Sequence, residues 1–295
     1  MSNQKWSGKT EGWGFGIKIF LTLIKIFGFM PAYALLVPVC FVYTIINSKA
    51  KKAIKQFRNH LNLKTNFFDY YAHFFSFSLS LIHRMGMLVR KNCKIKYSAQ
   101  NEDYIKNALE KGKGVILLSS HIGSWGIASE ILFKRIGTKV NILIFERDEE
   151  KMKKIYEDMN KNRNVNIIQL GENSLETALK IKDALQNGEI VAVLGDRYID
   201  DNVLEIEFLG EKAKFPRGIF EIACVTQTPI IPIFIMREKI NVYNFQVGQP
   251  LEIPNIDRKK RQEFIYNAMR DFVNQIEEQA KKTPLQWYNF YCFWD

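Results

Sequence analysis

The strongest constraint on the fold is a series of short apolar runs, rich in β-branched residues, that alternate with helical stretches from about residue 95 onward. These runs do not alternate apolar with polar residues, which is typical of strands covered on both faces. The runs are Val115–Ser119, Val140–Phe145, Val165–Leu170, Ile190–Leu194 and Ile230–Met236. The helical stretches are Ser124–Lys134, Glu149–Asn160, Ser174–Asn187, Arg217–Thr226 and a final one over Asp257–Lys282. The alternation predicts an α/β fold with a mostly parallel or mixed central sheet flanked by helices.

One junction between a predicted strand and a predicted helix carries a reactive side chain. Residues 119–126 (SSHIGSWG) follow the first apolar run, so His121 lies at the carboxyl end of a strand, where open α/β sheets bind their ligands. The small residues around it let a substrate approach, and histidine is the commonest general base. The backbone N–H groups near Gly123 and Ser124 are expected to stabilise an anion. The alternative is a structural histidine.

Charged side chains follow other predicted strands at the same edge of the sheet. Asp196 comes after the fourth apolar run and is expected to reach the same crevice, where it either orients the imidazole or binds a substrate group. Arg197 beside it is a fixed cation suited to phosphate, and Arg147 has a similar place after the second run. The alternative for these groups is a loop salt bridge. Arg217, followed by Gly218, opens a predicted helix and adds to an anion site there.

The basic character of the chain is confined to its first third. The net charge is +11 overall, but residues 1–100 carry +13 and residues 101–295 carry −2. The same third holds 23 consecutive uncharged residues, Ile26–Ser48. A basic cluster follows at once, formed by Lys49, Lys51, Lys52, Lys55 and Arg58. An apolar segment with flanking lysines favours a membrane with anionic lipid at its cytoplasmic face over a nucleic-acid partner.

The topology of this apolar segment stays open at the level of sequence. Gly28, Pro31 and Pro38 interrupt it, so a spanning helix and a re-entrant or interfacial helical hairpin are both compatible with it. A hydrophobic helix packed on the domain is the alternative without a membrane. We expect residues 1–90 to form an N-terminal membrane-anchoring helical region and residues 91–295 an α/β domain. The strongly aromatic C-terminal tail is expected to dock on that domain or on lipid.

Other chemistries lack their sequence signatures. The chain has neither a G-x-S-x-G nor a G-x-x-x-x-G-K-[ST] motif, which argues against a serine hydrolase and a P-loop enzyme. Its four cysteines are scattered, without a C-x-x-C pair, and suit a reducing cytosolic setting. No cluster of His, Cys and carboxylate residues has the spacing of metal ligands. We therefore expect no metal site.

Several short blocks, taken in their order and spacing, resemble the lysophospholipid acyltransferase superfamily, and most closely its branch of bacterial lipid A biosynthesis (lauroyl/myristoyl) acyltransferases. The resemblance covers nearly the whole chain and includes the N-terminal apolar segment. The blocks are Ser120–Trp125, Gly195–Arg197, Phe208–Gly210, Phe215–Gly218 and Pro229–Ile233. The ending, Gln286–Tyr291 with Phe293 and Trp294, is similar to a sub-branch found beside aryl polyene and flexirubin-type pigment lipid pathways.

The resemblance implies a membrane-associated acyltransferase of lipid biosynthesis on the cytoplasmic face of the bacterial inner membrane. A fatty acyl group would move from an acyl carrier protein or coenzyme A thioester to a hydroxyl of a lipid or glycolipid, without a cofactor. The resemblance gives His121 the role of general base. It implies that Arg147, Arg197 and Arg217 hold phosphates, and that a groove lined by Trp125 takes the acyl chain.

The sequence departs from the family pattern at one position of the motif. The family has His, four residues and then Asp or Glu, whereas the acidic position here is Gly126. Asp196 is the first candidate to replace that carboxylate, and Glu130, one turn further along the predicted helix, is the second. Because of this change, a non-catalytic lipid-binding protein of the same fold stays an alternative. A thioesterase or lipid hydrolase that uses the same base with water is another.

Overall fold

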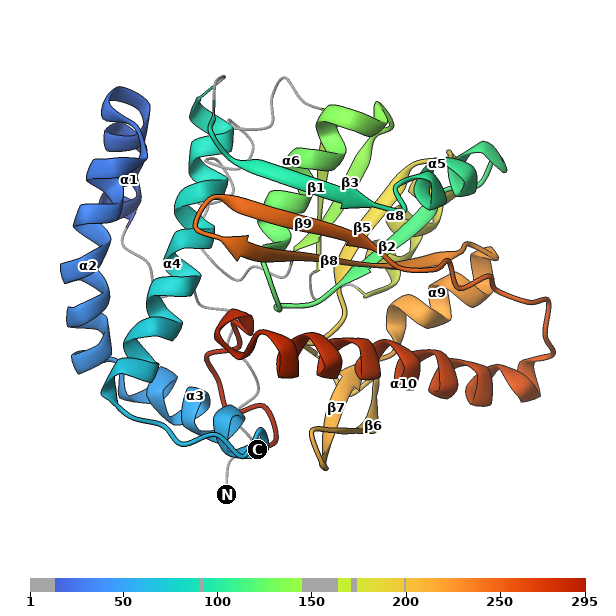
Figure 1. Cartoon of the computed structure of the whole chain (residues 1–295). Helices are drawn as coiled ribbons and strands as arrows, with labels where there is room; N and C mark the ends of the chain where they lie inside the picture. The colour runs from blue at the N-terminus through green and yellow to red at the C-terminus, as the bar shows by residue number, and fades with distance from the viewer. Residues whose placement is uncertain (1–13, 91–92, 145–163, 171–173, 199) are drawn as a thin grey trace.

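A seven-stranded sheet forms the centre of the protein (Figure 1). The computed structural model describes residues 14–90, 93–144, 164–170, 174–198 and 200–295. The strands of the sheet are β1 (Lys96–Gln100), β2 (Val115–Ser119), β3 (Val140–Ile144), β4 (Val165–Gln169), β5 (Ile190–Leu194), β8 (Ile230–Lys239) and β9 (Val242–Val247). They lie in the order β1-β9-β8-β2-β5-β3-β4, with every neighbouring pair parallel except β8 and β9. The predicted α/β fold with a mostly parallel sheet is confirmed.

Four strands of the structure are absent from the sequence prediction. Two of them, β6 (Val203–Phe208) and β7 (Glu211–Pro216), form a separate antiparallel hairpin. The other two, β1 and β9, lie toward one edge of the sheet, and more and less buried residues alternate along both. A search for uninterrupted apolar runs does not detect such strands. The predicted helix at Glu149–Asn160 lies outside the described residues.

Helices cover both faces of the sheet, which explains the apolar character of its central strands. Ile116 and Leu118 of β2 enter the core that α9 and α10 complete, whereas Val115 and Leu117 enter the core of α5 and α6. All four side chains are at most 1% exposed. The helices around the sheet are α5 (Asp103–Glu110), α6 (Trp125–Ile136), α8 (Ser174–Gln186), α9 (Gly218–Thr226) and α10 (Arg258–Lys282).

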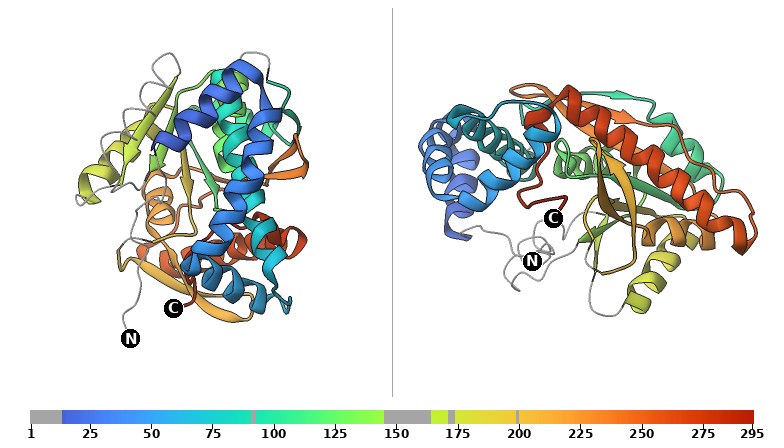
Figure 2. Two further views of the ribbon diagram at one scale, coloured as in Figure 1. Left: turned by 90° about the vertical axis from the view of Figure 1, so that its left-hand side faces the viewer. Right: turned by 90° about the horizontal axis from the view of Figure 1, so that it is seen from below.

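The first four helices gather at one end of the sheet (Figures 1 and 2). They are α1 (Gly14–Phe27), α2 (Phe29–Ile46), α3 (Ser48–His60) and α4 (Phe67–Val89). Gly28 separates α1 from α2 with a φ of 87°, which glycine adopts without steric penalty. Pro38 lies inside α2 and does not end it. The buried residues of α2 recur every fourth position along the side that packs on α4, and they are Ala32, Leu36, Cys40 and Thr44.

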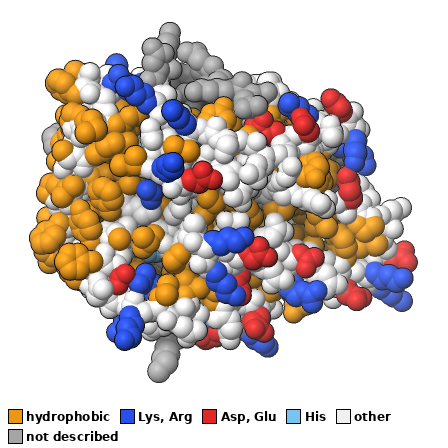
Figure 3. All heavy atoms as spheres, viewed as in Figure 1, with side chains coloured by type: hydrophobic (Ala, Val, Ile, Leu, Met, Phe, Trp, Pro, Cys, Tyr) orange, Lys and Arg blue, Asp and Glu red, His pale blue; other side chains and the backbone are white. Residues whose placement is uncertain are grey.

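The opposite side of α1 and α2 is apolar and exposed. Met30 is 76% exposed, and Val37 and Ile46 are 51% and 66% exposed. Figure 3 shows hydrophobic side chains gathered on the side of the molecule where these helices lie. Among the described residues, α2 is the one helix long and apolar enough to cross a membrane, with a mean hydropathy of 2.0. Its length is about 27 Å at 1.5 Å per residue, against about 30 Å for a hydrocarbon core.

One member of the predicted basic cluster is not available to lipid. Arg58 is 8% exposed and forms an ion pair of 2.8 Å with Asp69. Its guanidinium also donates to the carbonyl oxygen of Lys64, which fixes the loop between α3 and α4. Lys49 and Lys55, by contrast, are exposed. The basic face that follows α2 is therefore formed by lysines.

The turn between β2 and α6 requires a glycine for two reasons. Gly123 has a φ of 71°, and a Cβ atom at this position would overlap the carbonyl oxygen of Ile235 in β8. Gly137, which ends α6, has a nearly equal φ of 68° but has no atom near the place of a Cβ. Both glycines thus adopt a left-handed conformation, but only at Gly123 would a Cβ atom collide with a neighbouring strand.

We therefore expect Gly123→Ala to destabilise the protein more than Gly137→Ala. The left-handed conformation alone costs about 1–2 kcal/mol for alanine, and forcing atoms into a packed site adds about 1–3 kcal/mol. Thermal unfolding of the two variants in the same detergent checks the difference. Equal losses would show that the contact with β8 has no part in holding the turn.

Candidate functional site

The register of two parallel strands brings His121 and Asp196 together. β2 and β5 pair so that Ser119 lies beside Leu194, and both strands end there. His121 and Asp196 each follow two residues later, at the carboxyl edge of the sheet. The sequence predicts that each residue follows a strand, but it does not reveal that these two strands are neighbours.

The two side chains form a hydrogen-bonded pair. His121 Nδ1 lies 2.8 Å from Asp196 Oδ1, and the His121 backbone N–H donates to Asp196 Oδ2 at 2.9 Å. The Asp196 side chain is 1% exposed, whereas the His121 side chain is 14% exposed. The carboxylate is thus enclosed, and part of the imidazole faces solvent. Asp196, the first candidate for the missing family carboxylate, contacts the imidazole.

The electrostatics of the pair favour a neutral imidazole beside an ionised carboxylate. Burial lowers the pKa of His121 below its ordinary 6.5, and the positive charge of Arg197 acts in the same direction, while Asp196 opposes both. Burial acts to raise the pKa of Asp196, but the charge and hydrogen bonds of His121, with Arg197, outweigh it and the pKa is lowered. Both shifts leave His121 uncharged at neutral pH.

The hydrogen bond also selects the tautomer of His121. An ionised carboxylate only accepts hydrogen bonds, so Nδ1 carries the hydrogen and donates it to Asp196. Nε2 is then left with a lone pair. A neutral imidazole that is oriented by a carboxylate and has a bare nitrogen is suited to remove a proton from a hydroxyl or from water.

The C-terminal tail, residues 284–295, completes the surroundings of the pair. Asn289 Nδ2 donates to Asp196 Oδ2 at 3.0 Å, and the Tyr288 N–H donates to the His121 carbonyl oxygen at 2.7 Å. The tail thus docks on the domain, one of the two expected outcomes. The sequence does not predict Asn289 as a site residue, because nothing in an aromatic tail indicates a contact with a carboxylate 93 positions away.

The backbone N–H groups expected to stabilise an anion already have partners. The Gly123 N–H donates to the carbonyl oxygen of Gln286, and the Ser124 N–H donates to that of Ile235, both at 2.7 Å. These bonds tie the turn to the tail and to β8. Both N–H groups predicted to stabilise an anion therefore donate within the fold, one to the tail and one to β8.

Arg197 also has a different setting from the predicted one. Its Nε donates to Asn289 Oδ1 at 2.6 Å, and its Nη2 donates to the Tyr288 carbonyl oxygen at 3.0 Å. The guanidinium carbon lies 5.6 Å from the centre of the Tyr291 ring. The geometry therefore makes Arg197 an anchor of the tail.

The other described arginine of the expected anion site, Arg217, forms an ion pair on another helix. Arg217 precedes α9 and lies 2.9 Å from Glu221 in an ion pair, with 20% of its side chain exposed. Gly218 is the first residue of α9, so the helix begins one residue later than predicted. Arg147 lies outside the described residues.

An arginine occupies the space beside Gly126, which stands at the acidic position of the family motif. Gly126 lies in the first turn of α6, and a Cβ there would lie 2.5 Å from Cδ of Arg84 in α4. The Arg84 guanidinium lies 5.2 Å from the Trp125 ring, which is 6.2 Å from the His121 ring. An acidic side chain at position 126 would require Arg84 to move. Glu130 lies in α6, but its side chain is outside the described part of the chain.

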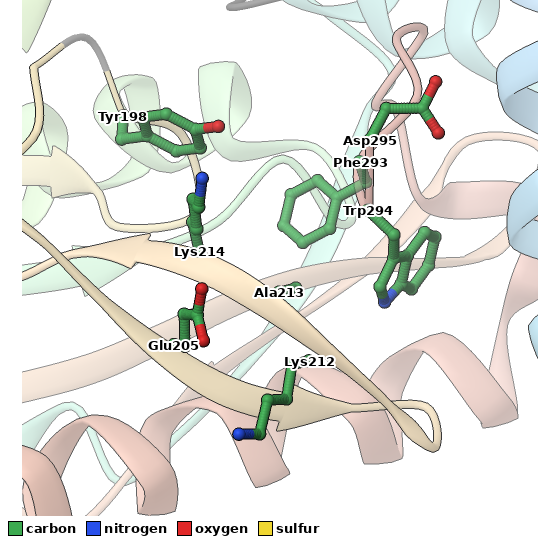
Figure 4. Close-up of a pocket in the computed structure, with 8 residues that line it drawn as sticks. All are labelled: Tyr198, Glu205, Lys212, Ala213, Lys214, Phe293, Trp294 and Asp295. Carbon is green, nitrogen blue, oxygen red and sulfur yellow. The ribbon is translucent and has the colours of Figure 1, made fainter. Parts of the chain in front are cut away.

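A cavity of about 210 Å³ lies between the β6–β7 hairpin and the end of the tail (Figure 4). Its lining includes Tyr198, Lys212, Lys214 and Trp294, but neither residue of the pair. Within the described ranges, no three His, Cys, Asp or Glu side chains gather as a metal site requires.

The tautomer of His121 can be tested directly with Asp196→Asn. The Oδ2 position accepts two N–H groups, from His121 and Asn289, so an asparagine keeps its one oxygen there and turns its amide nitrogen toward Nδ1. Nδ1 must then accept, and the hydrogen moves to Nε2. We expect nitrogen NMR of labelled histidine to show this change in Asp196→Asn and no change in Glu130→Gln. A persistent Nδ1–H form in Asp196→Asn would contradict the assignment.

Comparison with known proteins agrees with the resemblance seen in the sequence. The chain is similar to the phosphatidylinositol mannoside acyltransferase of Mycobacterium tuberculosis strain ATCC 25618 / H37Rv, at 24% identity over 156 residues. The protein of the same name from strain CDC 1551 / Oshkosh matches to the same extent. Each match covers 52% of this chain and 48% of the relative, so it spans about half of each protein. The family described as bacterial lipid A biosynthesis acyltransferase matches residues 68–294. The chain therefore belongs to the bacterial lipid A biosynthesis acyltransferase family.

Proposed function

We propose that the protein transfers a fatty acyl group from an acyl thioester to a hydroxyl of a lipid or glycolipid, with His121 as the general base. The observation that carries the proposal is the hydrogen-bonded pair of His121 and Asp196 at the carboxyl edge of the sheet. Family membership supports the class of reaction. The name of the mycobacterial relatives supports a glycolipid acceptor. The donor is an acyl carrier protein or coenzyme A thioester.

The proposed reaction uses the bare nitrogen of the imidazole. His121 Nε2 takes the proton of the acceptor hydroxyl, and the hydroxyl oxygen attacks the carbonyl carbon of the thioester. The tetrahedral intermediate then expels the thiolate, which receives the proton from the imidazolium. Asp196 holds the ring in place and stabilises its charged form. General base assistance of this kind contributes roughly 10²–10⁴-fold to the rate.

Stabilisation of the oxyanion is assigned to the amino end of α6 beyond Ser124. The N–H groups of Gly123 and Ser124 are bonded within the fold, as described above. The helix begins at Trp125, and the positive end of a helix dipole favours negative charge. The His121 ring lies 6.2 Å from the Trp125 ring, which supports a reacting centre next to this helix end.

We propose that the protein works on the cytoplasmic face of a bacterial inner membrane, held there by α1, α2 and α3. The exposed apolar side of α1 and α2 is suited to contact lipid chains. Lys49 and Lys55, at the start and in the middle of α3, are suited to anionic headgroups. A lipid acceptor would then reach the site without leaving the membrane surface.

The catalytic part of the proposal is tested by His121→Ala in purified protein. With acyl carrier protein or coenzyme A thioesters and a bacterial lipid extract, we expect acyl transfer to fall by about 10²-fold or more. Burial lowers the pKa of His121 below its ordinary 6.5, so the neutral base persists to more acidic pH than in a free imidazole, and the wild-type rate is expected to fall only below that ordinary value. Unchanged acyl transfer in His121→Ala would refute the assigned base. Free fatty acid released at full rate without an acceptor would identify a hydrolase instead.

The membrane part is tested by charge reversal on α3. We expect Lys49→Glu with Lys55→Glu to weaken binding to vesicles containing anionic lipid by about tenfold or more, since each lysine near such a surface contributes about 1 kcal/mol. Lys259→Glu with Lys260→Glu on α10 changes the net charge equally at exposed positions outside the N-terminal helices. Sedimentation with vesicles compares the two pairs. Equal weakening in both would show that only net charge matters.

A further inference from the structure

Asn289 bridges the two charged residues that follow β5. Its Nδ2 donates to Asp196 Oδ2 at 3.0 Å, and its Oδ1 accepts from Arg197 Nε at 2.6 Å. The residue is 2% exposed, so water does not offer substitute partners. An amide is the side-chain group that donates to a carboxylate with one end and accepts from a guanidinium with the other.

The backbone on both sides of Asn289 is held in place from several directions. The Tyr288 N–H donates to the His121 carbonyl oxygen, and the Tyr288 carbonyl accepts from Arg197. The Trp287 carbonyl lies 2.7 Å from His73 Nε2 in α4. These contacts fix the backbone at Asn289, so its amide is held in position to donate to Asp196.

We propose that Asn289 is a positioning residue for the reaction, which holds the Asp196 carboxylate in the orientation that keeps His121 Nε2 free. This inference rests on the proposed function of His121. Asp196 Oδ2 receives two N–H groups, one from the His121 backbone and one from Asn289, and Oδ1 is left for the imidazole. Without the amide, the carboxylate has one fewer contact to fix its rotation.

The charges around Asn289 determine what an added carboxylate would do. Asp196 and Arg197 contact it directly, and the phenol of Tyr291 lies beside Arg197. In Asn289→Asp, a second carboxylate would lie next to Asp196 and would partly neutralise Arg197. Both effects favour the imidazolium form of His121, so its titration is expected to move to higher pH.

The experiment compares Asn289→Asp with a matched change at Asn141. Asn141 is also buried, at 1% exposure, and its Nδ2 donates to the Glu189 carboxylate at 2.7 Å. It lies near the amino end of β3, at the opposite edge of the sheet from His121. Asn141→Asp thus makes the same chemical change beside a carboxylate without touching the site.

Three measurements are made on each variant of the whole chain in detergent. The first is the titration of the His121 ring by nitrogen NMR of labelled histidine; the chain has four histidines, and His121→Ala assigns the signal. The second is the dependence of kcat and KM on pH with a thioester donor and a lipid extract. Thermal unfolding reports the loss of stability in both variants.

For Asn289→Asp we expect the midpoint of the His121 titration and the acid limb of kcat to rise together by about one pH unit or more. In Asn141→Asp both should stay at the wild-type values, even if it unfolds at a lower temperature. Asn289→Ala is expected to lower kcat by about tenfold or more with little change in KM. Asn289→Ala also tests the inference if Asn289→Asp does not fold.

An unchanged titration and pH profile in folded Asn289→Asp would overturn the inference, as would a wild-type kcat in Asn289→Ala. These failures differ from failure of the proposed function. If the wild-type protein shows no acyl transfer that depends on His121, the function is wrong, while the NMR titration still reports whether Asn289 acts on the pair.

Discussion

The in-register pairing of β2 and β5 is the constraint on which the rest of the site depends. It sets Ser119 beside Leu194, and it therefore places the residues two positions beyond each strand side by side at one edge of the sheet. A shift of one residue would separate the imidazole from its carboxylate. The pairing is maintained by burial of both strands between two hydrophobic cores, so the precision of a polar contact derives from apolar packing.

Helix α4 connects the apolar end of the molecule to this edge of the sheet. One side of it packs on α2, and its other side meets the turn and the tail. Ser80 Oγ lies 2.7 Å from Ser124 Oγ at the start of α6, and His73 bonds the tail at Trp287. The surface that we assign to lipid and the pair that we assign to chemistry therefore rest on opposite sides of a single rigid element.

The sequence is sufficient for the α/β architecture and for five of the strands, and it places His121 and Asp196 after two of them. Apolar runs revealed the central strands because burial on both faces leaves no polar residue in them, and His121 and Asp196 could each be placed after a strand. Alternating strands such as β9 escaped the same criterion. The partners of Arg197 and of the Gly123 N–H could not be foreseen, because both lie in the tail, whose docking is set by contacts distant in sequence. The sequence shows that position 126 lacks a carboxylate, but it does not show that Arg84 fills the space there.

The docking of the tail has a consequence for the biosynthesis of the protein. Asn289 follows every strand of the sheet in the chain, and it lies 93 residues beyond the aspartate that it contacts. When the ribosome has synthesised every strand of the sheet, the tail that contacts the imidazole and its carboxylate has not yet left the ribosome. A nascent chain that stalls or is cleaved before this segment emerges lacks the amide that contacts Asp196, so the surroundings of the imidazole and its carboxylate are completed only after every strand of the sheet has been made.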